Sequence, residues 1–232
     1  MSILELPLIE RIRGTDHKDE CVVLLHGLAR SKVSLFKLEF ALSKHYHVFN
    51  KTYPSRKHTI EDLADIAIEA ALPANAEQYS KIHFVTHSMG GILVRQYLSQ
   101  HSLKNLGNVV MLGPPNQGSE LVDFFKKSSG LSRLFKAVNG PAGMQLGTDD
   151  NSRPNELGDV DFNLGVIAGC KSNNPISSRI LDGESDGKVS VNRSKVTGMT
   201  AHLVLPVNHT FMMLNEHVIS QIEYFLEHSE FE

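Results

Sequence analysis

Short apolar runs alternate with longer amphipathic stretches along the chain. Residues within a run are almost all apolar, which is typical of parallel strands covered on both faces. The runs lie at 21–25, 46–50, 82–87, 108–112, 164–169 and 202–207. Repeated strand–helix–strand units predict an α/β fold with a mainly parallel central sheet and helices on both faces. Residues 1–12 can add an edge strand, where Pro7 is tolerated better than at the centre of a sheet.

The clearest helix is predicted to begin after Thr59, because its side chain can cap the first turn and Asp62 follows three residues later. Pro73 ends this helix. One face carries Ile60, Leu63, Ala64, Ala67, Ile68, Ala71 and Leu72. A similar face near the end of the chain predicts a closing helix, with Leu214, Val218, Ile222, Phe225 and Leu226.

About fifty residues separate two of the predicted strands, at 114–162, which is more than one crossover needs. Two short amphipathic patterns come first, with Leu121, Phe124 and Phe125, then Leu131, Leu134, Phe135 and Val138. A polar stretch rich in Gly, Asn and Asp follows. We interpret this interval as a small helical cap inserted into a single domain spanning 1–232. The alternative is ordinary crossover helices followed by a loop.

Composition narrows the class of protein. The chain has 232 residues, of which 41% are hydrophobic and 21% charged, as in a globular domain. A net charge of −3 argues against nucleic acid or an anionic membrane as partner. No apolar run is long enough to span a membrane, and the N-terminus does not resemble a signal peptide, so we expect a cytoplasmic location. Cys21 and Cys170 lie in apolar runs and are predicted to be buried free thiols.

The segment Thr86-His87-Ser88-Met89-Gly90-Gly91 directly follows an apolar strand and opens a predicted helix. A sharp strand-to-helix turn lifts a serine hydroxyl clear of the sheet, provided that residues two positions away are small. Gly90 meets that requirement. The serine then lies at a helix N-terminus, where free N–H groups favour developing negative charge. Ser88 is therefore a candidate nucleophile.

This segment resembles the nucleophile elbow of α/β hydrolases, especially bacterial lipases and esterases. Thr86 replaces the first glycine of the usual pattern, and we expect its β-branched side chain to open the turn slightly. The resemblance implies an α/β-hydrolase fold and a Ser–acid–His order along the chain. It also implies an oxyanion hole formed by the backbone N–H groups of Met89 and of Leu28, which follows the strand ending in His26-Gly27. The His26 side chain itself is predicted to be a buried, hydrogen-bonded core histidine.

Only one of the twelve histidines has the position expected of a general base. Eight either precede Ser88 or lie just after its helix, and His202, His217 and His228 fall within predicted strands or helices. His209 lies in a loop at the carboxyl end of a strand, where catalytic loops of such sheets gather. We therefore assign the base to His209.

The acid is expected in the segment Asp182-Gly183-Glu184-Ser185-Asp186-Gly187-Lys188-Val189. This segment resembles the Asp-Gly-x-Val acid loop of the family, in which Asp186 is the member of the triad. Asp182 is the main rival, Glu184 is a third candidate, and a solvated acidic turn without catalytic role is the alternative.

Two further patterns receive structural interpretations. His45 and His47 lack other ligands at metal-binding spacing, so surface histidines are favoured and no metal is expected. Pro115-Asn116-Gln117-Gly118-Ser119 resembles a lipase segment that shapes the rim of the pocket.

Together these motifs predict a serine hydrolase that cleaves small-molecule acyl esters without metal or organic cofactor. Phe124, Phe125 and Phe135 of the cap are candidates for contacts with the acyl chain. A thioesterase, amidase or acyltransferase would use the same residues, and a non-catalytic ligand-binding relative is the alternative from another class. The sequence leaves the oligomeric state open.

Overall fold

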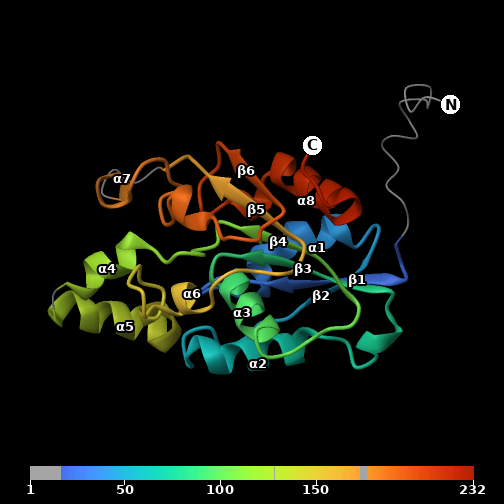
Figure 1. The fold of residues 1–232 in the computed structure, drawn as a ribbon, viewed down its shortest axis with the longest axis horizontal. Coiled ribbons are helices and arrows are strands. Elements are labelled where there is room, and N and C mark those ends of the chain that lie inside the picture. Colours follow the sequence, from blue (N-terminus) through green and yellow to red (C-terminus); the bar gives the residue numbers. More distant parts are fainter. Residues whose placement is uncertain (1–16, 128, 173–176) are drawn as a thin grey trace.

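The computed structural model describes residues 17–127, 129–172 and 177–232. The possible edge strand at 1–12 lies outside these residues. The six predicted strands form one sheet in which every pairing is parallel, in the order β2-β1-β3-β4-β5-β6 (Figure 1). The strands are β1 (Glu20–Leu25), β2 (His47–Asn50), β3 (Lys81–His87), β4 (Leu106–Leu112), β5 (Leu164–Gly169) and β6 (Ala201–Leu205). The prediction of a parallel α/β sheet is confirmed.

Helices cover both faces of the sheet, as predicted. The helices are α1 (Phe36–Leu42), α2 (Ile60–Ala71), α3 (Met89–Leu98), α4 (Glu120–Lys126), α5 (Ser129–Met144), α6 (Arg153–Glu156), α7 (Ser177–Ile180) and α8 (Glu216–His228). Short 3-10 helices lie at Lys32–Leu35, Ala76–Gln78, Asn192–Ser194 and Met212–Leu214. Side chains of α2 and α3 belong to the core on one face, and side chains of α1 and α8 belong to the core on the other. No helix in the described ranges has both the length and the apolar character needed to cross a bilayer.

The local signals in the sequence explain where the elements begin and end. The Thr59 hydroxyl accepts a hydrogen bond from the Asp62 N–H at 3.4 Å, which caps α2 as expected. The closing helix α8 begins after Asn215, whose side chain caps it, so Leu214 lies just before the helix. The last strand ends at Leu205, two residues earlier than predicted, because Pro206 has no N–H with which to extend a ladder.

Three helices, α4 to α6, occupy the interval between β4 and β5, at the end of the sheet to which the strands run (Figure 1). The polar stretch that follows the amphipathic patterns is anchored to the core rather than being a simple loop. The buried Arg95 guanidinium of α3 donates to the carbonyl oxygens of Pro154 and Gly158 at 3.0 and 2.6 Å. The Gln145 side chain binds the first turn of α2 through Ile60 N and Glu61. The helices thus lie over the carboxyl ends of the strands.

Candidate active site

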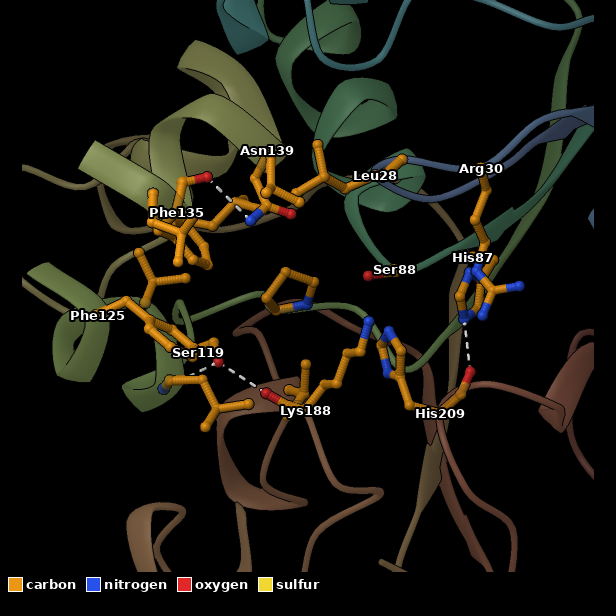
Figure 2. A pocket seen from close by; sticks show the side chains of 18 of the residues that line it. Leu28, Arg30, His87, Ser88, Ser119, Phe125, Phe135, Asn139, Lys188 and His209 are labelled. Carbon is orange, nitrogen blue, oxygen red and sulfur yellow. Dashed lines mark hydrogen bonds between the residues drawn. The ribbon is translucent and has the colours of Figure 1, made fainter. Parts of the chain in front are cut away.

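Ser88 lies at the junction of β3 and α3, where the sequence pattern predicts a sharp turn. Its φ of 56° and ψ of −125° lie in a region that residues with a side chain rarely adopt. Such strain is concentrated at functional sites, where the surrounding structure maintains it. The turn requires Gly90, since a Cβ there would lie 2.6 Å from the Leu25 carbonyl oxygen. The Ser88 hydroxyl is directed into a cavity (Figure 2).

Thr86, the departure from the usual elbow pattern, is accommodated by Gly91 on the next turn. A Cβ at Gly91 would lie 3.2 Å from the Thr86 Oγ1 and 2.8 Å from the Met111 Sδ. Thr86 is buried, and its hydroxyl has no hydrogen-bond partner within the described part of the chain. The second glycine of the Gly90-Gly91 pair therefore provides the space that the larger side chain needs.

His209 is joined to Asp186 by a short buried hydrogen bond. The distance between His209 Nδ1 and Asp186 Oδ2 is 2.7 Å, and each residue is about 3% exposed. The other carboxylate oxygen of Asp186 accepts the backbone N–H groups of Lys188 and Val189 at 2.9 and 2.8 Å. These bonds to a carboxylate fix its orientation, and the carboxylate in turn fixes the ring of His209.

The two rival acids do not make this contact. Asp182 and Glu184 are both exposed, whereas Asp186 is buried and is followed by Gly187 with a φ of 95°. The Asp186 backbone contributes as well, since its carbonyl oxygen accepts the His209 N–H at 2.9 Å. The tertiary structure thus pairs His209 with Asp186 among the three carboxylates of this segment.

His87 packs against His209 and forms a hydrogen bond with its backbone. Its Nε2 donates to the His209 carbonyl oxygen at 2.9 Å, and the two ring centroids are 4.7 Å apart. Burial lowers the pKa of His87 well below its ordinary value, and the neighbouring His209 acts in the same direction. A neutral His87 with its proton on Nε2 leaves Nδ1 as an acceptor, and this buried atom has no partner among the described residues. Gly27 leaves room for it, since a Cβ there would lie 2.8 Å from Nδ1.

Ser88 and His209 line the same cavity, although no hydrogen bond joins the Ser88 Oγ to the His209 ring among those of the described residues. Such bonds are often long in the absence of substrate and shorten in the reacting complex. The arrangement therefore brings a serine, a histidine and a carboxylate from three separate strand ends to one point.

Of the two residues whose backbone amides are predicted to form the oxyanion hole, Leu28 lines the cavity and Met89 directly follows the lining residue Ser88. Met89 is the first residue of α3, where an N–H has no partner within its own helix. Among the described residues, the backbone hydrogen bonds of turns, loops and helix caps include neither the Leu28 N–H nor the Met89 N–H. The His26 side chain is fully buried, with Nδ1 on the Gly27 carbonyl oxygen at 2.9 Å and Nε2 accepting from Tyr53 N at 3.3 Å, as the core interpretation expects.

The cavity has a volume of about 400 Å³. Apolar side chains of α4 and α5 form the wall opposite His209, with Phe125 and Phe135 stacked at 5.1 Å (Figure 2). Phe124 does not line this wall, because adjacent residues on a helix face different directions. Pro115 and Ser119 do line the cavity, and the Ser119 Oγ donates to the Lys188 carbonyl oxygen at 2.7 Å while capping α4. These two residues shape the rim of the pocket, as expected.

Three residues that sequence reasoning missed also belong to this site. Arg30 and Lys188 line the cavity, and Gly113 faces the bond between Asp186 and His209. Lys188 follows the acid by two residues and Arg30 follows Leu28 by two, so their positions in the two loops were a usable signal. Gly113 directly follows β4, where its φ of 53° requires a residue without a side chain.

The described residues contain no group of three or more His, Cys, Asp or Glu side chains placed to hold a metal ion. His47 instead forms a hydrogen bond with the Tyr79 hydroxyl at 3.0 Å. Cys21 and Cys170 are free, with Cys21 fully buried and Cys170 partly exposed. Burial raises the pKa of the Cys21 thiol to about 12.

No family model and no curated protein matches this chain. Solved structures match it over most of its length. Lipase BlEst2 from Bacillus licheniformis, in its mature form, is 20% identical with a TM-score of 0.65, covering 87% of this chain and 89% of that one. Phospholipase PlaB from Legionella pneumophila is 19% identical with a TM-score of 0.71, covering 94% of this chain and 60% of PlaB. A monoacylglycerol lipase from Paleococcus ferrophilus is 17% identical with a TM-score of 0.60, covering 93% of this chain and 96% of that one.

Structural similarity at 17–20% sequence identity establishes the fold and not the activity. The sheet order, the helices on its two faces and the strand–turn–helix around Ser88 agree with that architecture. The chain therefore has the α/β-hydrolase fold, and the solved structures that it resembles include lipases.

Proposed function

We propose that this protein is a serine hydrolase that cleaves carboxylic esters through an acyl-enzyme intermediate. The observation that carries the proposal is the convergence of a strained Ser88 and a buried Asp186–His209 pair on one cavity. A ligand-binding protein has no need of a histidine whose tautomer is set by a carboxylate. The combination of nucleophile, base and orienting acid is what acyl transfer requires.

The first half of the reaction begins with His209. Because the Asp186 carboxylate accepts from Nδ1, the proton of the neutral ring is on Nδ1 and Nε2 can accept. As the Ser88 Oγ attacks the carbonyl carbon, His209 Nε2 takes the hydroxyl proton. The same proton passes to the alcohol oxygen when the C–O bond of the ester breaks. The alcohol leaves, and the acyl group remains on Ser88.

The Leu28 and Met89 N–H groups would hold the oxyanion of each tetrahedral intermediate. Donors fixed in advance contribute strongly, and the loss of one commonly lowers the rate about 10²–10³-fold. In the second half of the reaction, His209 removes a proton from water and the resulting hydroxide attacks the acyl carbon. Ser88 is then released with its proton restored.

The apolar lining of the cavity favours a substrate with an acyl chain. One wall is apolar, with Phe125, Phe135 and neighbouring side chains, which suits an acyl chain. Among the structural neighbours, BlEst2 and the Paleococcus ferrophilus protein are named as lipases. Thioesters and amides would react through the same steps, so a panel of acyl esters, thioesters and amides of graded chain length defines the preferred bond.

A fluorophosphonate probe tests the nucleophile directly. Wild-type protein should be labelled at Ser88, and Ser88→Ala should abolish both the labelling and the esterase activity. The matched control is Ser119→Ala, which removes a second hydroxyl from the same cavity and should leave labelling in place. Absence of label on folded wild-type protein, or undiminished label on Ser88→Ala, would exclude the proposal. Undiminished labelling of His209→Ala would remove His209 as the base.

A further inference from the structure

Two positive charges line the cavity around Ser88, and none of its described lining residues is acidic. Arg30 and Lys188 come from the loops after β1 and β5, respectively. The rest of the lining is mainly apolar. The chain as a whole carries a net charge of −3, so this local excess of positive charge does not reflect a basic protein.

Neither cation forms an ion pair within the described part of the chain, and Asp186, the carboxylate that acts on Lys188, is held by other groups. Among the ion pairs of the described residues, none includes Arg30 or Lys188. The Arg30 Nη2 donates to the Thr210 carbonyl oxygen at 3.2 Å, which places this guanidinium next to His209. Both oxygens of Asp186 are already occupied by the His209 ring and by backbone N–H groups.

The Lys188 side chain reaches into the cavity toward Ser88 and the His209 ring (Figure 2). Lys188 is exposed at the surface, yet desolvation and the nearby Arg30 guanidinium lower the pKa of its ammonium group, and the Asp186 carboxylate opposes this shift. His209 must itself become cationic during the proposed reaction. Asp186 offsets the charge of the imidazolium, so a neutral substrate would leave Arg30 and Lys188 as the uncompensated charges around the cavity.

The geometry also indicates which part of the substrate would meet these cations. The apolar wall of α4 and α5 lies across the cavity from His209 and Lys188 (Figure 2). An acyl chain on that wall directs the alcohol part of the ester toward His209, which must protonate the leaving oxygen. Arg30 and Lys188 lie on this alcohol side.

We propose that Arg30 and Lys188 bind an oxyanion on the alcohol part of the substrate. This inference rests on the proposed function and names its substrate class, which is acyl esters whose leaving alcohol carries a phosphate or a carboxylate. Both groups accept charge-assisted hydrogen bonds from guanidinium and ammonium donors. In the complex, the oxyanion offsets the charges of the two side chains, while Asp186 offsets that of the imidazolium.

Three esters with the same short acyl chain test this preference. The neutral ester is 1-hexanoylglycerol, the phosphate-bearing one is 1-hexanoylglycerol 3-phosphate, and the carboxylate-bearing one is the hexanoyl ester of 4-hydroxybutanoate. Wild-type kcat/KM should be about 10–100-fold higher for one or both anionic esters than for the neutral ester. The two anionic arms identify which oxyanion the site prefers. The advantage should shrink near 1 M salt, where the Debye length falls to about 3 Å.

Substitutions at Lys188 separate binding from folding. Lys188→Met should lower kcat/KM for the preferred anionic ester at least about tenfold more than for the neutral ester. Lys188→Arg should restore the preference, and Lys188→Glu should reverse it. The matched control is Lys104→Met, at an exposed turn before β4, which removes the same charge outside the cavity and should change nothing.

Equal kcat/KM for all three esters with wild-type protein would overturn this inference, as would an equal loss for all three in Lys188→Met. Labelling of Ser88 by the uncharged fluorophosphonate probe distinguishes the two levels of failure. Labelled wild-type protein without a preference contradicts the substrate class alone. Protein that is neither labelled nor active on any of the esters contradicts the hydrolase function, and this inference falls with it.

Discussion

Gly113 leaves the space in which the Asp186 carboxylate meets His209. A Cβ at this position would lie 2.7 Å from Asp186 Oδ2 and 3.1 Å from His209 Nδ1. Gly113→Ala should therefore push the carboxylate and the ring apart, and a shift of about 1 Å at such a pair can lower kcat about 10²-fold. Esterase kinetics and urea unfolding together measure the effect.

Gly158→Ala is the matched control for Gly113. Gly158 also has a positive φ, 64° against 53°, but a Cβ there would meet nothing within 4 Å. The Gly158→Ala variant should lose about 1–2 kcal/mol of folding stability from backbone strain alone and keep full esterase activity. Equal activity in the two variants would show that Gly113 has no part in positioning the pair.

Asp186→Asn should preserve the shape of the site and remove the charge that orients His209. An amide can donate to Nδ1 and so favour the wrong tautomer, which in a comparable triad lowers kcat about 10⁴-fold. Asp182→Asn, four residues away and exposed, should leave kcat unchanged. The reverse pattern would transfer the role of the acid to Asp182.

Phe135→Ala should weaken the apolar wall on which an acyl chain would lie. Phe135 is partly buried, lines the cavity and stacks on Phe125. We expect kcat/KM for long acyl esters to fall about tenfold, with a smaller change for acetyl esters, since burying a methylene contributes about 0.8 kcal/mol. Phe124→Ala, in α4 but outside the lining, is the control. A loss that is the same for every chain length would argue against this wall as the acyl site.

Thr86→Val should stabilise the protein by about 1 kcal/mol, because it replaces a buried hydroxyl that lacks a partner with a methyl group of similar shape. Chemical denaturation measures the change. Thr200→Val provides the contrast, since the Thr200 hydroxyl donates to Asn163 Oδ1 at 2.6 Å and accepts from Leu164 N at 3.2 Å. A destabilised Thr86→Val variant would mean that the Thr86 hydroxyl has a partner in solution.

The folded protein should lose stability as the pH falls below about 6.5. Burial lowers the pKa values of four histidines, His26, His83, His87 and His202. Below pH 6.5 the unfolded chain therefore binds protons that the folded protein does not, and unfolding becomes more favourable. Each histidine contributes up to about 1.4 kcal/mol per pH unit, until the pH reaches its lowered pKa in the folded state.

Urea unfolding between pH 7 and about pH 5 measures this slope. His87→Gln keeps an amide that can donate to the His209 carbonyl oxygen, and it should reduce the slope by about one proton. His217→Gln, at an exposed position of α8, should leave the slope as in the wild type. A slope that His87→Gln does not alter would mean that His87 is charged in the folded protein.

The strands, the capped helix α2 and the turn around Ser88 follow from the sequence by itself, because each depends on a local pattern. Buried parallel strands need continuous apolar runs, and a strand-to-helix turn needs a small residue such as Gly90. His209 was also distinguished locally, as a loop residue at the end of a strand, although its role as base awaits the tests above.

The Asp-Gly-x-Val pattern already favoured Asp186 over Asp182 and Glu184, but only the tertiary structure shows its contact with His209. That contact is a hydrogen bond across 23 residues of chain, and a local pattern cannot establish it. A local pattern likewise could not show that Gly113 faces this pair, or that Phe125 lines the cavity and Phe124 does not. Lys188 and Arg30 are ordinary loop cations in the sequence. Folding brings them to one cavity that has no acidic lining residue among those described, because the segments after β1 and β5 meet at the same end of a parallel sheet.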